Sequence, residues 1–248
     1  MQYRASFIML STSIFISSAL EFVGIWALFN RFGQLKTWTL AEVALFYGIV
    51  NMAMAIAKAA SRGFDHFSTT IRQGDFDRLL LRPRSTVLQL LGQELQLMRI
   101  GHFLQGLFIL LYAAYVLDIA WTIPKALLVV ASVLGGACVF GGLFILRATL
   151  CFWTTESLDL INAVSYGGQE TARYPLSIYH KWFRRFFTYV IPLACISYYP
   201  ALVILNRTDP LGSPTWFQWT APAIGAIFYV LCLQFWHLCT RHYRSTGS

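Results

Sequence analysis

The sequence predicts an all-α membrane protein with about six transmembrane helices and short amphipathic helices at one membrane surface. Of the 248 residues, 57% are hydrophobic and only 12% are charged, whereas soluble domains carry roughly 25% charged residues. Apolar runs also recur along the chain, and each crossing of a ~30 Å hydrocarbon core needs about 20 such residues. Little length is left for a soluble domain, so we expect residues 1–248 to form a single transmembrane domain.

The apolar runs predict six spans joined by short polar turns. The first run is too long for a cleavable signal sequence, and no small-residue cleavage site closes it. Residues 156–181 are too polar to span, so we expect them outside the hydrocarbon core. The fifth span contains Pro192 and Pro200, which predict a kinked or broken helix whose last part is re-entrant at the outer face. The expected spans are residues 5–29, 40–60, 100–117, 124–152, 186–205 and 216–239.

The basic residues predict the orientation. The formal net charge is +8, and the cations lie beside apolar runs, which indicates the positive-inside rule and anionic membrane lipid rather than nucleic acid. With six spans, Arg4, the residues after span two, residues 147–185 and the pair Arg241 and Arg244 fall on one side. We therefore expect that side, with both termini, to be cytoplasmic.

Residues 61–84, called the polar segment below, interrupt the apolar N-terminal half between spans two and three. Apolar side chains recur at helical spacing on both sides of a break at Gly74, which predicts two short amphipathic helices at the membrane surface. One interpretation is a solvated interfacial loop, and the other is a docking element for a soluble partner. The residues that define the two helices are Phe64, Phe67, Ile71, Gly74, Phe76, Leu79, Leu80 and Pro83.

The chain lacks the common catalytic and cofactor motifs. It has no GxxxxGK[ST] phosphate loop, no GxSxG and no HExxH. The five cysteines form no CxxC pair and the five histidines lack metal-ligand spacing, so no metal site is expected. We therefore expect the chain to bind no cofactor and to have no enzymatic activity of its own.

Glu21 is the clearest charge inside an expected span, and such residues are candidates for function. It would either face a cavity, or snorkel to headgroups or hydrogen-bond between helices. A pair with Arg147 is rejected because Glu21 lies roughly 24 Å along its helix from residue 5, whereas Arg147 is near the inner surface. Glu21 and, in the broken fifth span, Tyr198 and Tyr199 are the candidates for a translocation path.

The layout and several segments resemble the permease subunit of an ABC-2 type transporter, in the branch of viologen and drug exporters. Within GDFDRLLLRP, the residues Gly74, Phe76, Asp77, Leu80, Arg82 and Pro83 fit the pattern G-x-[FL]-D-x-x-L-x-[RK]-P. The other segments follow in family order across nearly the whole chain. They are WTLAEVALFYG from residue 38, FW at 152–153, YPLSIY at 174–179, VIPLACISYYPA at 190–201 and the terminal RHYRSTGS.

The resemblance implies a permease in the bacterial inner membrane that exports a small amphipathic or hydrophobic molecule. It implies two partners: an ABC ATP-binding subunit, which holds ATP and Mg²⁺, and a second permease subunit in a homodimer or heterodimer. The alternatives are an ion-coupled carrier or channel, which the scarcity of intramembrane acids disfavours, and a lipid-modifying enzyme, for which no polar cluster converges. The implied contact residues for the ATP-binding subunit are Phe64, Phe67, Gly74, Phe76, Asp77, Leu79, Leu80, Arg82 and Pro83.

Overall fold

The computed structural model describes residues 2–93, 96–153, 158–210 and 212–243, and within these ranges the chain contains helices and no strand. Five helices are long and apolar enough to cross a membrane, and a sixth crossing is counted if one bent pair is taken as a span. The predicted all-α membrane fold is therefore confirmed. The five helices are α1 (Gln2–Phe32), α2 (Leu40–Ala60), α7 (Ile100–Val116), α8 (Ile123–Leu150) and α14 (Ala223–His242).

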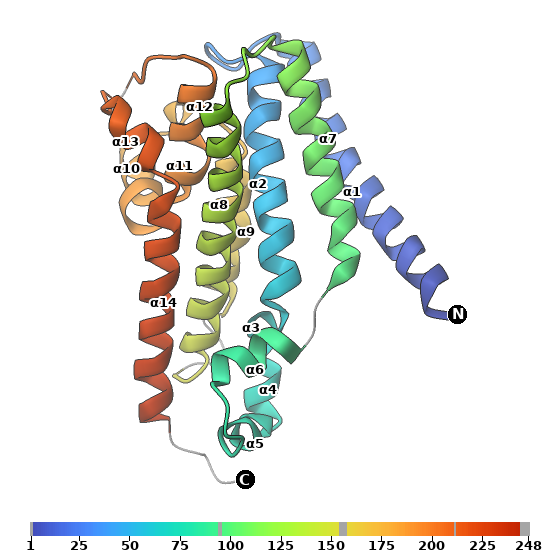
Figure 1. Ribbon diagram of the computed structural model, residues 1–248, viewed down its shortest axis with the longest axis vertical. Coiled ribbons are helices and arrows are strands. Elements are labelled where there is room, and N and C mark those ends of the chain that lie inside the picture. Colours follow the sequence, from blue (N-terminus) through green and yellow to red (C-terminus); the bar gives the residue numbers. More distant parts are fainter. Residues whose placement is uncertain (1, 94–95, 154–157, 211, 244–248) are drawn as a thin grey trace.

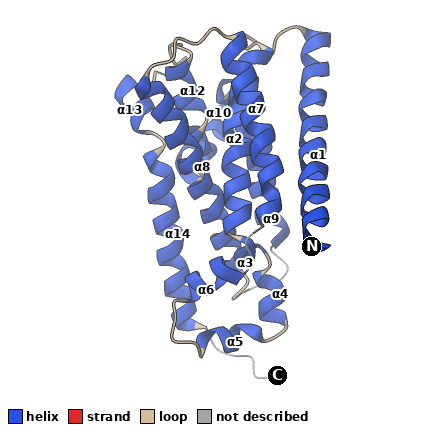
Figure 2. Cartoon of the chain, turned by 45° about the vertical axis from the view of Figure 1, so that its right-hand side comes forward, coloured by secondary structure: helices blue, strands red, loops and turns tan. Residues whose placement is uncertain are grey.

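The long helices form an elongated bundle (Figures 1 and 2). α2 is its centre and is buried along most of its length. α7 packs closely on α2, because Gly48 of α2 leaves room for the backbone of α7. α8 and α14 meet as closely, since a Cβ atom at Gly225 would lie 2.2 Å from the carbonyl oxygen of Gly135. α1 leans away from the other helices and lies mainly along α7.

The bundle has two distinct ends. At the end that we call the loop end lie the turns of residues 33–39 and 117–122 and the connection of residues 205–214. Thr39 there begins α2 with a capping box, accepting from the Glu42 amide while the Glu42 carboxylate accepts from the Thr39 amide. At the opposite end, the termini end, α1 begins, α14 ends, and four short helices gather. These are α3 (Arg62–Asp65), α4 (Phe67–Arg72), α5 (Asp75–Leu80) and α6 (Thr86–Gln93), followed by η1 (Leu97–Arg99).

α9 (Leu158–Ala172) lies inside the bundle beside α2 and α8, so the prediction that residues 156–181 stay outside is wrong. Contacts follow α2 from one end to the other. The Lys58 ammonium lies 4.7 Å from the centre of the Tyr166 ring, and the Trp38 indole donates to Ser177 at 3.0 Å. η2 (Leu176–Ile178) thus reaches the loop end. Residues 158–178 run antiparallel to α2, and the side chains of Gln169, Arg173 and Ser177 find partners within the bundle.

The segment predicted as the fifth span, residues 186–205, is broken as its prolines indicated, and the structure turns it back on itself. α10 (Lys181–Arg185) with η3 (Phe186–Val190) meets α11 (Leu193–Ile196) and α12 (Tyr198–Ile204) at a 75° bend. The segment starts at the loop end, where Lys36 donates to the Ile178 carbonyl, and it ends there, where Lys125 donates to the Ile204 carbonyl. The re-entrant form expected for its last part thus extends to the whole segment.

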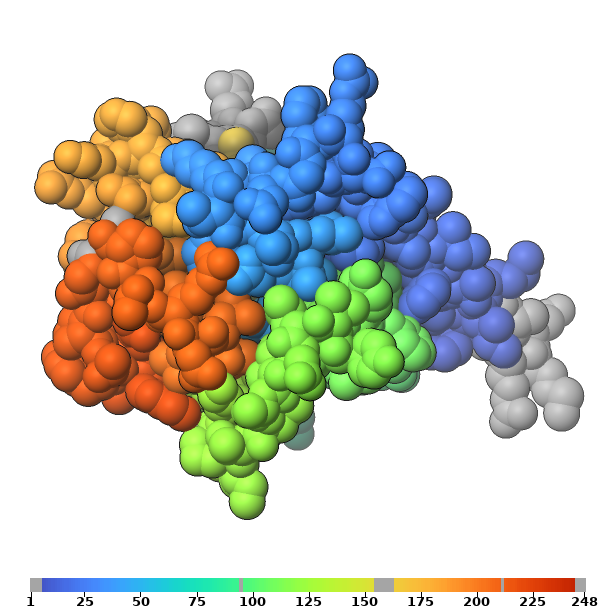
Figure 3. Space-filling model, turned by 90° about the horizontal axis from the view of Figure 1, so that it is seen from above, coloured from blue at the N-terminus to red at the C-terminus, as the bar shows by residue number. Residues whose placement is uncertain are grey.

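Proline chemistry explains the turn. Pro192 begins α11, and Pro200 lies in the first turn of α12, where the missing amide costs no helical hydrogen bond. The consequence for the charges is large: Lys181, Arg184 and Arg185 lie at the loop end, not beside Arg147 at the termini end as predicted. Figure 3, which looks down on the loop end, shows α10–α12 on one side and α1 on the other. α13 (Thr215–Thr220) then leads into α14 across a break at Pro222.

Candidate functional site

A polar cavity of about 460 Å³ opens between α1, α2, the start of α7 and α9. Its walls carry charges of both signs within a bundle that is otherwise apolar. This combination is unusual inside a membrane protein, since buried charges are retained where they are paired or functional. The polar lining residues are Ser13, Ser17, Ser18, Glu21, Lys58, Arg99, His102, Tyr166, Gln169, Glu170 and Arg173.

Arg173, directly after α9, is the centre of this cavity's charge network. Its side chain is only 3% exposed. The guanidinium donates to Asn51 Oδ1 at 2.8 and 3.0 Å, to Glu21 Oε2 at 2.9 Å, and to the Glu170 carboxylate. It also lies over the Tyr47 ring, 4.7 Å from its centre. The buried cation is thereby satisfied on nearly every side, as its burial requires.

Amide side chains extend the network to four helices. Asn51, near the middle of α2, donates to Gln105 of α7 at 3.2 Å and accepts from Gln169 of α9 at 3.4 Å. Gln105 in turn donates to the carbonyl of Ser18 in α1 at 3.2 Å. The Tyr47 hydroxyl donates to the same carbonyl at 2.9 Å. α1 is therefore tied to the bundle by polar groups at mid-length, where its apolar packing is sparse.

Glu21 lines this cavity and also hydrogen-bonds between helices, so it combines two of the interpretations that the sequence left open. Its side chain is 52% exposed, whereas its partner Arg173 is buried. Arg147 pairs with Asp65 of α3 at 2.6 Å, so the rejection of a Glu21–Arg147 pair is confirmed. The half-exposed carboxylate remains open to a molecule entering the cavity.

The second region is the polar segment at the termini end, which is fixed to the bundle by aromatic rings. Phe67, Phe76, Phe152 of the turn after α8, and Trp236 of α14 lie with ring centres 4.9–6.2 Å apart. Phe64 meets the same indole at 5.2 Å. All three phenylalanines of the segment are fully buried within the chain. The rings therefore hold α3–α5 against the ends of α8 and α14.

Charges and a turn complete this attachment. Gly74 has a φ of +71°, a conformation that glycine adopts without strain, and it separates α4 from α5. The Arg147–Asp65 pair joins α3 to α8. At the end of α14, burial, the charge of Asp77 and a hydrogen bond to Asp77 raise the pKa of Tyr243. α5 is thus linked to the bundle twice, through the ring of Phe76 and through the hydrogen bond of Asp77 to Tyr243.

The family model described as ABC-2 family transporter protein matches residues 15–247. The chain belongs to this family of transporter membrane proteins. No curated protein and no solved structure matches it. The family model thus assigns the permease to a family, and the roles of its individual residues are inferred from its own structure.

In this ABC-2 permease, the predicted contact residues of the polar segment divide into two groups. Phe64, Phe67, Phe76 and Leu79 are buried in the chain itself. Leu80 is 43% exposed, and the side chains that follow it are exposed as well. The exposed surface of the polar segment is therefore formed by Leu80, Leu81, Arg82, Pro83 and Arg84.

The predicted path residues are not brought together. Tyr198 donates to Asp209 at 2.9 Å near the loop end, and Tyr199 lines a different hollow there. Neither tyrosine lines the cavity of Glu21. Sequence reasoning missed Arg173 and Asn51 of the permease. A signal was present, since Asn51 is a lone amide in an apolar helix and polar residues recur from Gln169 to Arg173.

Proposed function

We propose that this permease is the membrane subunit of an ATP-driven ABC exporter in the bacterial inner membrane. The observation that carries the proposal is the polar segment, where the three short helices α3–α5 are anchored by buried aromatic rings and present an exposed apolar and basic rim. Such a rim suits the groove of a soluble ATP-binding subunit. ATP and Mg²⁺ would be held by that subunit. Among the described residues no group of three or more His, Cys, Asp or Glu could hold a metal.

The termini end is proposed to be cytoplasmic, with both chain termini on that side. Support comes from the arginines of the polar segment, of which Arg72, Arg78, Arg82 and Arg84 are exposed. The loop end carries cations too. There Lys36 and Lys125 donate to backbone carbonyls, Arg207 pairs with Glu42, and Lys181, Arg184 and Arg185 line a hollow. A second permease subunit, identical or related, completes the proposed complex.

The cavity of Glu21 and Arg173 is the proposed part of the translocation path. Its volume falls within the roughly 300–1,000 Å³ range of small-molecule sites. Carboxylates of Glu21 and Glu170 and the cations Lys58 and Arg99 border the same space. A molecule with a charged polar part would be accommodated better than a wholly apolar one. The proposal therefore narrows the exported class to amphipathic molecules.

Coupling would follow from the attachment of the polar segment. Because rings from α4, α5, α14 and the turn after α8 share one cluster, movement of the segment would carry the ends of α8 and α14 with it. The Arg147–Asp65 pair would transmit the same movement through α3. Closure of the ATP-binding subunit would then rock helices as rigid bodies.

The test is co-expression with and without the ATP-binding subunit. The purified permease alone should hydrolyse no ATP, since it lacks a phosphate-binding loop. The co-purified complex should hydrolyse ATP and export an amphipathic probe from loaded vesicles. Robust hydrolysis by the single chain, free of contaminating ATPase, would contradict the assignment.

One observation favours the second candidate, an ion-coupled carrier. Glu21 and Glu170 place two carboxylates in the cavity, where the sequence had indicated few intramembrane acids. Both carboxylates pair with Arg173, so their charge is already matched by the protein and they do not form a site for a transported cation. Transport driven by an ion gradient without the ATP-binding subunit would establish this candidate instead.

A further inference from the structure

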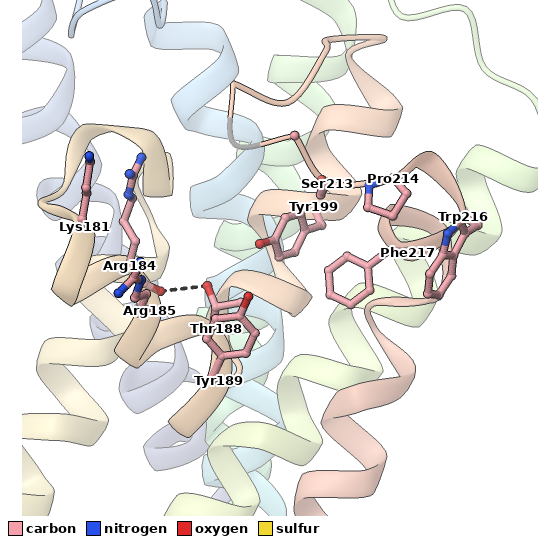
Figure 4. A pocket seen from close by; sticks show the side chains of 11 residues that line it. Lys181, Arg184, Arg185, Thr188, Tyr189, Tyr199, Ser213, Pro214, Trp216 and Phe217 are labelled. Atoms are coloured by element: carbon pink, nitrogen blue, oxygen red, sulfur yellow. Dashed lines mark hydrogen bonds between the residues drawn. The ribbon is translucent and has the colours of Figure 1, made fainter.

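A second hollow, of about 620 Å³, lies at the loop end between the re-entrant segment and α13. Figure 4 shows Lys181, Arg184 and Arg185 along one side and the rings of Tyr199 and Phe217 across from them. It is separate from the cavity of Glu21, with which it shares no lining residue. Nothing in the proposed export mechanism uses it.

The charge of this hollow is entirely positive. Its lining contains the three cations of α10 and no Asp or Glu. Among the described residues, no carboxylate lies within ion-pair distance of these cations. Asp209, an acid at the loop end, accepts from the Tyr198 hydroxyl and from the Ser213 amide. Three cations that face one space without an acid favour a bound anion, and guanidinium groups fit phosphate oxygens especially well.

An apolar groove continues from the same hollow. It has a volume of about 250 Å³, lies between η3 and α14, and shares Thr188, Tyr189 and Phe217 with the basic hollow. Ile224, Ile227 and Leu231 line it at helical spacing. These positions cover about 10 Å of α14, running from the loop end towards the middle of the bundle. A charged hollow thus opens directly onto an apolar channel.

We propose that the two spaces together bind one anionic phospholipid from the leaflet at the loop end. Its phosphate contacts Lys181, Arg184 and Arg185, and one acyl chain lies in the groove along α14. Charge complementarity selects the headgroup, and the continuity of the two spaces selects an amphiphile over a free anion. The surrounding surface agrees, since Tyr189 is 81% and Trp216 is 68% exposed, as in the aromatic belts found at headgroup level.

The bound lipid would brace the re-entrant segment. α10–α12 contact α14 only sparsely, because the groove separates η3 from that helix. An acyl chain in the groove fills this gap with apolar contacts, while the headgroup neutralises α10. This role is independent of ATP coupling.

Native mass spectrometry of the detergent-purified full-length protein, with any ATP-binding subunit that co-purifies, tests the proposal. The probes are dioleoyl phosphatidylglycerol, dioleoyl phosphatidylcholine and glycerol 3-phosphate. Wild-type protein should retain phosphatidylglycerol in preference to phosphatidylcholine. Arg184→Gln and Arg185→Gln should each weaken retention about fivefold, at ~1 kcal/mol per cation near an anionic lipid. Arg31→Gln, an exposed cation of α1 at the same end, is the matched control and should change nothing.

The groove is tested separately with Ile227→Trp, which fills it without altering the charge. This variant should lower the retention of phosphatidylglycerol. The ability of glycerol 3-phosphate to displace the lipid that remains should be the same as in the wild type. Equal retention of both lipids by the wild type, or unchanged retention by the two arginine variants, would overturn the proposal. Competition by glycerol 3-phosphate as effective as by the whole lipid would show a small-anion site and would overturn the lipid assignment.

Discussion

The polar segment and α9 are both polar stretches in an apolar chain, yet they occupy opposite environments. The polar segment turns Phe67 and Phe76 into the bundle and keeps most of its arginines outside. α9 does the reverse, for the Arg173 that follows it is buried against Asn51 and Glu21. Composition alone therefore does not decide which polar stretch enters a membrane bundle. The availability of partners does, because a buried charge must be paired.

The comparison also assigns different roles to the two regions. The polar segment offers an exposed rim for a soluble partner on an anchored base, and the α9 region builds a cavity with charges of both signs. If the assignment is right, damage to one region should not reproduce damage to the other. The following variants are ordered from the largest expected effect to the smallest.

The largest expected difference is the side of the membrane on which the re-entrant segment and the polar segment lie, which a labelling experiment reports as all or none. In a background without cysteine, single cysteines at Arg185 and Ser213 should react with a membrane-impermeant maleimide from the same side. A cysteine at Thr69 in the polar segment should react only from the other side. The physical reason is that α10 and residue 213 border one hollow at the loop end. Reaction of positions 185 and 69 from the same side would restore the crossing that the sequence predicted for residues 186–205.

Phe76→Ala should cause the largest loss of stability. The ring is fully buried among Phe67, Phe152 and Tyr243, and deleting such a ring costs about 3–5 kcal/mol. Thermal unfolding should shift down, and the ATP-binding subunit should no longer co-purify. Leu80→Ala is the control from the exposed rim. It should weaken co-purification, by up to about 2 kcal/mol, without lowering thermal stability.

Arg173→Gln should abolish transport while leaving assembly intact. The substitution removes the bonds to Glu21 and Glu170 and disturbs the amide network around Asn51. We expect a stability cost on the order of 2 kcal/mol, because water can still reach the half-exposed Glu21. Transport into vesicles and co-purification should be measured together. Wild-type transport by this variant would remove the cavity from the path.

Glu21→Gln should have a smaller effect in the same direction. The amide oxygen can still accept from Arg173, whose remaining bonds to Asn51 persist. Export of a cationic amphiphile should fall about tenfold, since a half-exposed carboxylate in the cavity is lost. Export of an uncharged amphiphile is the internal control and should change less. Equal rates for the cationic probe before and after the substitution would leave Glu21 a purely structural residue.

Charges of the polar segment should give the smallest effects. Arg82→Ala should weaken assembly by no more than ~1 kcal/mol, because exposed ion pairs contribute little. Asp77→Lys should be worse than Asp77→Ala, since a cation would replace the group that bonds Tyr243 and would lie near arginines. Co-purification with the ATP-binding subunit ranks the three variants. If Arg82→Ala lost more of the co-purified subunit than either Asp77 variant, the assignment of the rim would be contradicted.

The two regions differ in how far the sequence predicts them. The break at Gly74 is a local signal, and the apolar spacing on both sides of it is visible within a few residues. The partners of Arg173 are remote, 122 residues away at Asn51 and 152 at Glu21. No local pattern reveals that these side chains meet, so α9 was expected outside the bundle.

The re-entrant segment is an intermediate case. Pro192 and Pro200 predict that residues 186–205 break, and the structure bends there by 75°. A proline does not show on which side a broken helix returns. That side is decided by contacts of Lys36 with residue 178 and of Lys125 with residue 204, again between distant parts of the chain.

The most direct test of the two-region account compares Phe76→Ala and Arg173→Gln in one assay that records co-purified ATP-binding subunit, basal ATPase and substrate-stimulated ATPase. We predict that Phe76→Ala loses the subunit and with it all ATPase activity. Arg173→Gln should retain the subunit and the basal rate but lose stimulation by the exported amphiphile. The same loss in all three measurements for both variants, or loss of the subunit with Arg173→Gln alone, would contradict the division between the polar segment and the cavity.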